Sequence, residues 1–193
     1  MSFTKEKSDE KLTQKHFGAV PGRHGTQGRR VGPGGHGSRA VLCDPSWNQT
    51  LPAATRFIVL TNMNSEAVLD RETGLVWEKE PGVSARDWRV SSTHCTLLSL
   101  GGRKGWRLPT IQDLASLIDP AVAFPGPVLP SGHPFIGIHL FPYGYWSSTS
   151  AFNTDPAGAW TVFFNNGTMG SRGKFTDTHI PWCVRGGQGA DPQ

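Results

Sequence analysis

The stretch Gly105-Trp-Arg-Leu-Pro-Thr-Ile-Gln-Asp113 decides how the surrounding chain folds. Thr110 stands at the N-cap position of a helix, and Asp113 stands three residues later, at the second position of a capping box. An apolar stripe follows, formed by Leu114, Leu117 and Ile118. The Trp-Arg-Leu-Pro segment predicts a fixed turn before this helix, with Arg107 bound to backbone carbonyls or to a buried acid.

A second helix is predicted upstream of this turn, over residues 84–98. Its inner face carries Trp88, Ser91, Cys95 and Leu98, which are spaced by three and four residues. The glycines of Gly101-Gly102 suit the end of such a helix. Two helices therefore flank the Trp-Arg-Leu-Pro turn.

Short strands are predicted on both sides of the helices. Before them, residues 56–60, 67–70 and 75–77 are apolar or β-branched, and the turn at 71–74 ends on a glycine. After them, residues 145–148, 159–164 and 181–185 follow the same pattern. Residues 119–143 contain six prolines and three glycines, which indicates a long irregular loop. Strands, two helices, a loop and more strands predict an α+β domain.

Composition separates a tail from this domain. All seven tryptophans lie at or beyond Trp47, and residues 1–45 carry eight basic against four acidic side chains, whereas the remainder carries eleven of each. We therefore expect a disordered, basic, Gly-rich tail at 1–45, a lead-in at 46–55, a domain at 56–186 and a disordered C-terminus at 187–193. We identify no signal peptide, no membrane span and no nucleic-acid-binding signature.

Several motifs of the predicted domain resemble one bacterial family. They are Leu69-Asp-Arg-Glu-Thr-Gly-Leu-Val-Trp77, Cys95, Gly105-Trp-Arg-Leu-Pro-Thr110, Leu114, Tyr145-Trp-Ser-Ser-Thr149, Ala159-Trp160 and Cys183-Val-Arg185. This family of unknown function includes the C-terminal domain of the Legionella collagen-like adhesin. The resemblance implies a C-type-lectin-like fold, with two helices and short antiparallel strands, and a location at the cell surface or outside the cell.

The resemblance also suggests a disulfide bond. Cys95 and Cys183 match the positions at which the lectin-like fold joins its first helix to its final strand, although two buried thiols in contact are the alternative. Cys43 lies in the predicted tail, where it either remains free or joins two chains.

Catalytic and metal chemistry find little support in the residues. The calcium-binding triplets of sugar-binding lectins, Glu-Pro-Asn and Trp-Asn-Asp, are absent. The histidines have no paired ligand spacing; they are His16, His24, His36, His94, His133, His139 and His179. No hydrolase, phosphate-loop or dinucleotide motif is present. We therefore expect a protein that is not an enzyme and has no cofactor or metal. Trp77, Trp106, Trp146, Trp160 and Trp182 are expected in the core.

The resemblance places a ligand-binding surface near the C-terminus. Relatives of the fold include variable proteins of diversity-generating retroelements, whose diversified positions follow the segment that matches Tyr145-Trp-Ser-Ser148. Carried over to this chain, the candidate surface comprises Phe152, Asn153, Asp155, Asn165, Asn166, Thr168, Arg172, Lys174, Asp177 and His179. Such a mixture of polar, charged and aromatic groups suits recognition of a protein or a glycan.

One alternative function stays open. The domain could be a structural or assembly module of a larger surface or phage particle, with no specific ligand. The apolar segment Phe135-Ile-Gly-Ile-His-Leu-Phe141 is the candidate contact face for such a role. The sequence leaves the oligomeric state open.

Overall fold

The structure of the chain, a computed structural model, describes residues 51–152 and 157–187. The chain divides into two units, Met1–Val41 and Leu42–Gln193. The first unit lies entirely outside the described residues, as do the expected tail at 1–45 and residues 188–193. All described residues belong to the second unit.

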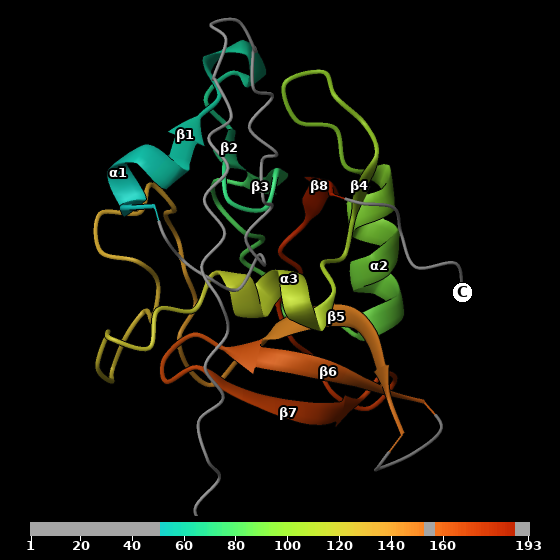
Figure 1. Ribbon diagram of the computed structural model, residues 1–193. Helices are drawn as coiled ribbons and strands as arrows, with labels where there is room; N and C mark the ends of the chain where they lie inside the picture. Colours follow the sequence, from blue (N-terminus) through green and yellow to red (C-terminus); the bar gives the residue numbers. More distant parts are fainter. Residues whose placement is uncertain (1–50, 153–156, 188–193) are drawn as a thin grey trace, which may run out of the picture. The chain divides into compact units, whose positions relative to one another are not determined.

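A five-stranded antiparallel sheet gathers segments from both ends of this unit. Its strands are β1 (Phe57–Val59), β2 (Ala67–Asp70), β3 (Leu75–Glu78), β8 (Val184–Gly186) and β4 (Trp106–Arg107), in that order (Figure 1). The short helix α1 (Ala53–Arg56) precedes β1 and begins inside the expected lead-in, and the 3-10 turn η1 (Thr61–Met63) joins β1 to β2. The last strand thus returns to pair with β3 and β4.

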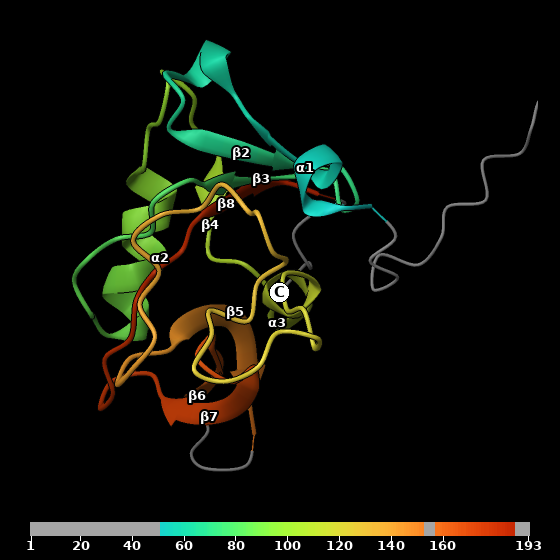
Figure 2. The same cartoon turned by 90° about the vertical axis from the view of Figure 1, so that its left-hand side faces the viewer.

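A separate three-stranded antiparallel sheet is built from one continuous stretch. It has the order β5 (Tyr145–Ala151), β6 (Gly158–Phe163) and β7 (Thr168–Gly173). The helix α3 (Ile111–Ser116) lies between the two sheets, and α2 (Trp88–Leu97) lies at one side of the domain (Figures 1 and 2). This arrangement confirms the predicted α+β class.

The two helices begin where side chains cap them. The Thr110 hydroxyl accepts from the Asp113 amide at 3.1 Å, and the Asp113 carboxylate accepts from the Thr110 amide at 2.9 Å, so the predicted capping box is confirmed. The helix predicted over 84–98 is shorter, because the Asp87 carboxylate accepts from the Val90 amide and makes Asp87 the N-cap. Arg107 donates to Asp113 at 2.8 Å and to the Leu108 and Gly186 carbonyls, as expected.

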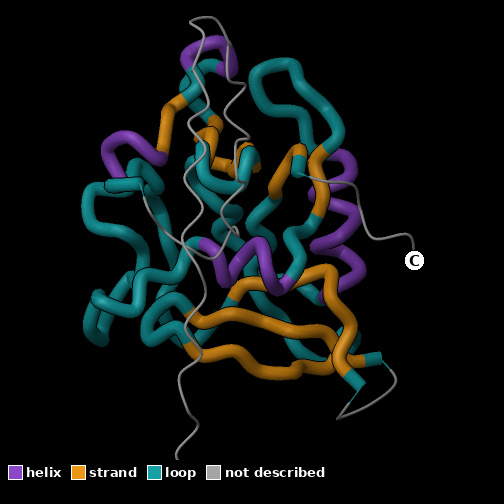
Figure 3. Tube along the Cα trace, viewed as in Figure 1, coloured by secondary structure: helices purple, strands orange, loops and turns teal. Residues whose placement is uncertain are grey.

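The predicted long loop is present and contributes to the core. Residues 119–143 contain no helix or strand (Figure 3). Val128, Leu129 and Phe135 of this loop are nevertheless buried. The Val128 amide donates to the Phe164 carbonyl at 2.8 Å, and the Tyr145 hydroxyl accepts from the His139 amide at 2.7 Å. Buried apolar anchors and backbone hydrogen bonds therefore fix the loop without regular structure.

Aromatic rings fill the space between the sheets. The Trp182 ring lies 5.0–5.5 Å, centroid to centroid, from four neighbours, which are Trp77, Phe135, Tyr145 and Phe164. Such tilted and edge-to-face contacts are favoured between aromatic rings. Trp77, Trp106, Trp146 and Trp182 are buried as expected, but Trp160 is only half-buried, so its assignment to the core is corrected.

Buried ions tie the first strands to α3. The guanidinium of Arg56 donates to both carboxylate oxygens of Asp70 at 2.9 and 2.7 Å, and to the Ser116 carbonyl at 2.8 Å. Glu72 lies 3.1 Å from the same guanidinium. Arg56 and Asp70 are fully buried, so their charges depend on each other for compensation.

Candidate ligand-binding surface

The register of the three-stranded sheet brings three of the predicted site residues to one end of the sheet. Ser150 on β5 pairs with Ala159 on β6, which pairs with Arg172 on β7. Just past these pairs, the Lys174 amide donates to the Ala157 carbonyl, which continues the ladder. Phe152 directly follows β5 and Lys174 directly follows β7, so both residues lie at the end of the sheet that carries Ser150 and Arg172.

Lys174 is held in a defined position between β5 and α2. Its ammonium lies 4.3 Å from the centroid of the Trp88 ring and donates to the Ser150 hydroxyl at 2.9 Å. The Trp88 indole is fixed in turn, because it donates to the Ser147 carbonyl at 2.7 Å. A cation over an aromatic ring gains electrostatic stabilisation, and this one remains half-exposed.

Arg172 is the second cation that lies against an aromatic ring. Its guanidinium carbon is 5.4 Å from the centroid of the Phe163 ring, and one nitrogen donates to the Ser171 carbonyl at 2.9 Å. No carboxylate lies within ion-pair distance of Arg172 or Lys174 in the described part of the chain. Neither positive charge is therefore paired with an acid among the described residues.

Two exposed aromatic side chains lie at the same end of the sheet. Phe152 follows directly after β5 and is 91% exposed, and Phe175 follows β7 and is 68% exposed. The strand ends meet there, because Ala151 pairs with Gly158 and Gly158 pairs with Gly173. We name Trp88, Phe152, Arg172, Lys174 and Phe175 the cation–aromatic surface. The sequence analysis did not include Trp88 in the site, because it was expected on the inner face of a helix. It did not include Phe175 either, although this residue directly follows Lys174.

The asparagines of the predicted site lie at the opposite end of the sheet. The Asn166 side chain accepts from the Thr168 amide at 3.0 Å and from its hydroxyl at 2.8 Å, which closes the β6–β7 turn. Asn165 precedes it, half-buried. At about 3.3 Å per residue, roughly 20 Å separates Thr168 from Lys174. Asn165, Asn166 and Thr168 therefore do not join the cation–aromatic surface.

Asp177 and His179 have structural positions. The Asp177 carboxylate accepts from the Gly173 amide at 2.7 Å, which closes the turn after β7. His179 is buried, its Nδ1 accepts from the Gly144 amide at 3.1 Å, and its ring packs against Trp146 and Phe163. The expectation that His179 lies on the binding surface is thus corrected.

The charge state of His179 follows from this burial. Burial and, to a smaller extent, the positive charge of Arg172 together lower the pKa of His179 to about 4, and the negative charge of Asp177 opposes this shift. The imidazole is therefore neutral near pH 7. Asn153 and Asp155, the remaining predicted site residues, lie outside the described residues.

Comparison with protein families decides the identity of the domain. The sequence profile of the Lcl C-terminal domain matches residues 66–185, which is most of the folded unit.

The chain belongs to the Lcl C-terminal domain family.

This assignment confirms the resemblance to the family of the Legionella collagen-like adhesin C-terminal domain. No curated protein matches the chain at a significant level. Among the described residues, no helix is long and apolar enough to cross a membrane.

A surface pocket of this Lcl C-terminal domain, the α2 hollow, runs along α2. It has a volume of about 740 Å³ and is lined by polar and apolar side chains of the helix and its flanks, among them Arg86, Arg89, Val90, His94 and Leu97. Most of its lining residues belong to α2, and Leu97 is 76% exposed. It therefore offers a second place for a ligand.

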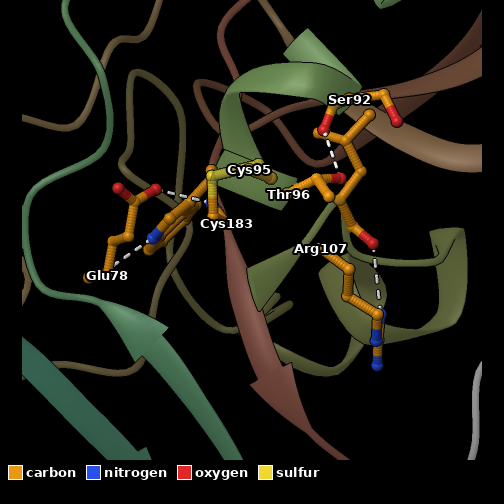
Figure 4. Close-up of a disulfide and its surroundings, with 8 residues drawn as sticks. Glu78, Ser92, Cys95, Thr96, Arg107 and Cys183 are labelled. Atoms are coloured by element: carbon orange, nitrogen blue, oxygen red, sulfur yellow. Dashed lines mark hydrogen bonds between the residues drawn. A yellow bond between two sulfur atoms is a disulfide. The ribbon is translucent and has the colours of Figure 1, made fainter. Parts of the chain in front are cut away.

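The Lcl C-terminal domain also contains the predicted disulfide bond. Cys95 of α2 and Cys183, directly before β8, are joined and fully buried (Figure 4). The Glu78 carboxylate points toward this bond and accepts from the Cys183 amide at 2.6 Å. Burial raises the pKa of Glu78 to about 7, against the effect of that hydrogen bond. A nearby His94 is half-buried, and burial together with the Arg86 charge lowers its pKa.

These groups form the one candidate metal cluster among the described residues. Ligand atoms of Glu78, His94 and Cys183 lie within 4.8 Å of one another. The Cys183 sulfur is occupied by its bond to Cys95, so a thiolate is missing while the disulfide is intact.

Proposed function

We propose that this Lcl C-terminal domain is a non-catalytic, adhesin-like module that binds a protein or glycan ligand through the cation–aromatic surface. The observation that carries the proposal is the exposure of Phe152, at 91%, beside a Lys174 ammonium held 4.3 Å from the Trp88 ring. An exposed ring next to a positioned cation offers both apolar contact and a charged hydrogen-bond donor to a ligand.

The rigidity of this surface supports the proposal. Trp88 donates to β5, Lys174 donates to β5 and Arg172 lies against Phe163, so each anchor is fixed before a ligand arrives. Positioned side chains lose less conformational entropy on binding than free ones do. The α+β architecture and the bond from α2 to the segment before β8 fit the expected lectin-like scaffold, and the disulfide fits a location at the cell surface or outside the cell.

Binding should be tested on glycan and protein arrays with the full chain and a Phe152→Ala/Phe175→Ala variant. A matched control is Leu97→Ala, because it also removes an exposed apolar side chain but lies in the α2 hollow. We expect specific binding that is lost in the double variant and kept in the control, with unchanged melting temperatures. Loss of binding in Leu97→Ala alone would instead place the site on α2.

The assembly alternative receives separate support from the loop after α3. Phe141 is 80% exposed and Ile136 is 48% exposed, whereas Phe135 between the sheets is buried. The apolar segment at 135–141 is therefore split between core and surface. If no array ligand is found and the chain self-associates in sedimentation experiments in a way that Phe141→Ser abolishes, the assembly role replaces the binding role.

A further inference from the structure

The junction between α2 and the segment before β8 gathers four groups that suit a metal ion. We name Glu78, His94, Cys95 and Cys183 the α2–β8 junction. Atoms of Glu78, His94 and Cys183 lie within 4.8 Å of one another, and the sulfur of Cys95 is bonded to that of Cys183 at 2.10 Å. One imidazole, one carboxylate and the Cys183 sulfur therefore lie close together, and the Cys95 sulfur is bonded to that of Cys183.

We propose that the reduced protein binds one Zn²⁺ ion at the α2–β8 junction. Zn²⁺ prefers four ligands in a tetrahedron and takes thiolate, imidazole and carboxylate at about 2.0–2.3 Å. Ligand atoms of a zinc tetrahedron therefore lie roughly 3.3–3.8 Å apart. The 4.8 Å that encloses the three ligand atoms exceeds this spacing by about 1.0–1.5 Å, so the proposal requires the side chains to move closer together when the ion binds.

The burial of Glu78 favours a metal over a purely structural role. Glu78 is only 5% exposed, and its carboxylate accepts one hydrogen bond from the Cys183 amide. A neutral glutamine could accept the same bond without the cost of burying an acid. A bound divalent cation would compensate a charged carboxylate here, which gives the choice of glutamate a physical reason.

Formation of the site requires reduction of the disulfide. A dithiol reductant transfers two electrons and two protons, so the bond between Cys95 and Cys183 breaks, two thiols form and the reductant becomes a cyclic disulfide. Binding of Zn²⁺ then releases the two thiol protons to solvent. A small-molecule disulfide oxidant then accepts two electrons from the two thiolates, so the bond between Cys95 and Cys183 forms again and the ion is released. The oxidant takes up two protons from solvent and becomes two thiols.

The two states would fasten the same two segments. The disulfide joins α2 to the segment before β8, and the zinc ion would join α2, that segment and β3, which carries Glu78. The fold would thus be cross-linked by zinc in a reducing environment and by the disulfide in an oxidising one.

The test uses the full chain with Cys43→Ser, so that only the junction cysteines respond. Reduced and oxidised samples are titrated with Co²⁺ and followed by the absorption of tetrahedral thiolate-bound cobalt; Zn²⁺ is then measured in competition with a chromogenic chelator. We expect one ion per reduced chain and none per oxidised chain. Reduced protein without thiolate-to-cobalt absorption would overturn the proposal, whether the reduced chain is folded or unfolded.

Variants distinguish this site from two reactive cysteines alone. Glu78→Gln and His94→Ala are each expected to weaken Zn²⁺ binding at least tenfold, whereas His133→Ala, a half-buried histidine in the long loop, leaves it unchanged. Circular dichroism of the oxidised variants establishes that each one folds. Equal Zn²⁺ affinity in the wild type, Glu78→Gln and His94→Ala would contradict the four-ligand site.

Discussion

The ammonium of Lys174 lies 4.3 Å from the centroid of the Trp88 ring, although the two residues are 86 positions apart in the sequence. The backbone repeats this pairing, because the Trp88 amide donates to the Lys174 carbonyl at 3.0 Å. The start of α2 is thereby attached to the end of the three-stranded sheet. One contact thus combines a structural connection with an exposed positive charge.

The charge of Lys174 should matter for binding more than for folding. In Lys174→Met the aliphatic stem still covers Trp88, so we expect a loss of about 0.5–1 kcal/mol in the free energy of unfolding. Ligand affinity should fall at least tenfold, because the charged donor is absent. Urea unfolding and a binding titration measure the two effects. A variant that binds as tightly as the wild type would remove Lys174 from the site.

The disulfide should supply a large share of the stability. Its cysteines are 88 positions apart, and the chain-entropy relation gives about 4–5 kcal/mol for closing such a loop. We therefore expect Cys95→Ala/Cys183→Ala to lower the free energy of unfolding by about that amount. Urea denaturation in a zinc-free buffer measures this change. Cys43→Ser is the control and should unfold at the wild-type midpoint. A shift below about 1 kcal/mol would contradict the entropic account.

The buried pair of Arg56 and Asp70 gives a prediction for the core. Both side chains are fully buried, so Asp70→Asn leaves the guanidinium with less compensation. We expect a loss of about 3–5 kcal/mol in the free energy of unfolding, measured by chemical denaturation. Arg107→Lys, which alters a half-exposed ion pair, should cost about 1 kcal/mol or less. Equal losses of unfolding free energy in the two variants would show that burial of an ion pair does not determine its contribution to stability.

Glu78 predicts a dependence of stability on pH. Its pKa rises from 4.5 to about 7 on folding, so its contribution to stability is fully present below pH 4.5 and is lost as the pH rises through 7. As the pH rises from 4.5 to 7.5, the free energy of unfolding of Glu78→Gln should therefore increase by about 3 kcal/mol relative to that of the wild type. Parallel urea titrations across this range measure the difference. A constant difference would mean that the carboxyl is not perturbed.

His179 predicts the opposite dependence of stability on pH. Its pKa falls from 6.5 to about 4 on folding, so its contribution is present above pH 6.5 and is lost as the pH falls through 4. Relative to His179→Gln, the wild type should lose stability as the pH is lowered from 6.5 to 4. The same urea titrations detect this change. A wild type that gains stability relative to the variant would show that His179 is protonated in the folded protein.

Local signals explain which elements were predictable. The capping box of α3 and the apolar strands β2 and β3 carry their own signals, so their positions agree with prediction to within one residue. Strand β7 was missed because Thr168–Gly173 contains two glycines and one β-branched residue, and only its pairing with β6 makes it a strand. The pairing of β8 between β3 and β4 is likewise non-local.

The candidate site was predictable only in part, for the same reason. Phe152, Arg172 and Lys174 were expected near one another, and the register of β5, β6 and β7 brings them to one end of the sheet. Trp88 belongs to the surface because it contacts Lys174, which is distant in the sequence. His179 does not belong to it, because its ring packs against Trp146 and Phe163. Such long-range contacts leave no pattern in the local sequence.

The most direct test of the binding surface is hydrogen–deuterium exchange of the full chain with and without the ligand identified on the arrays. The account predicts slower exchange at the amides of residues 86–89, 148–152 and 172–176, and no change in the β6–β7 turn. Protection confined to residues 93–99 on the far half of α2, with residues 172–176 unchanged, would contradict it.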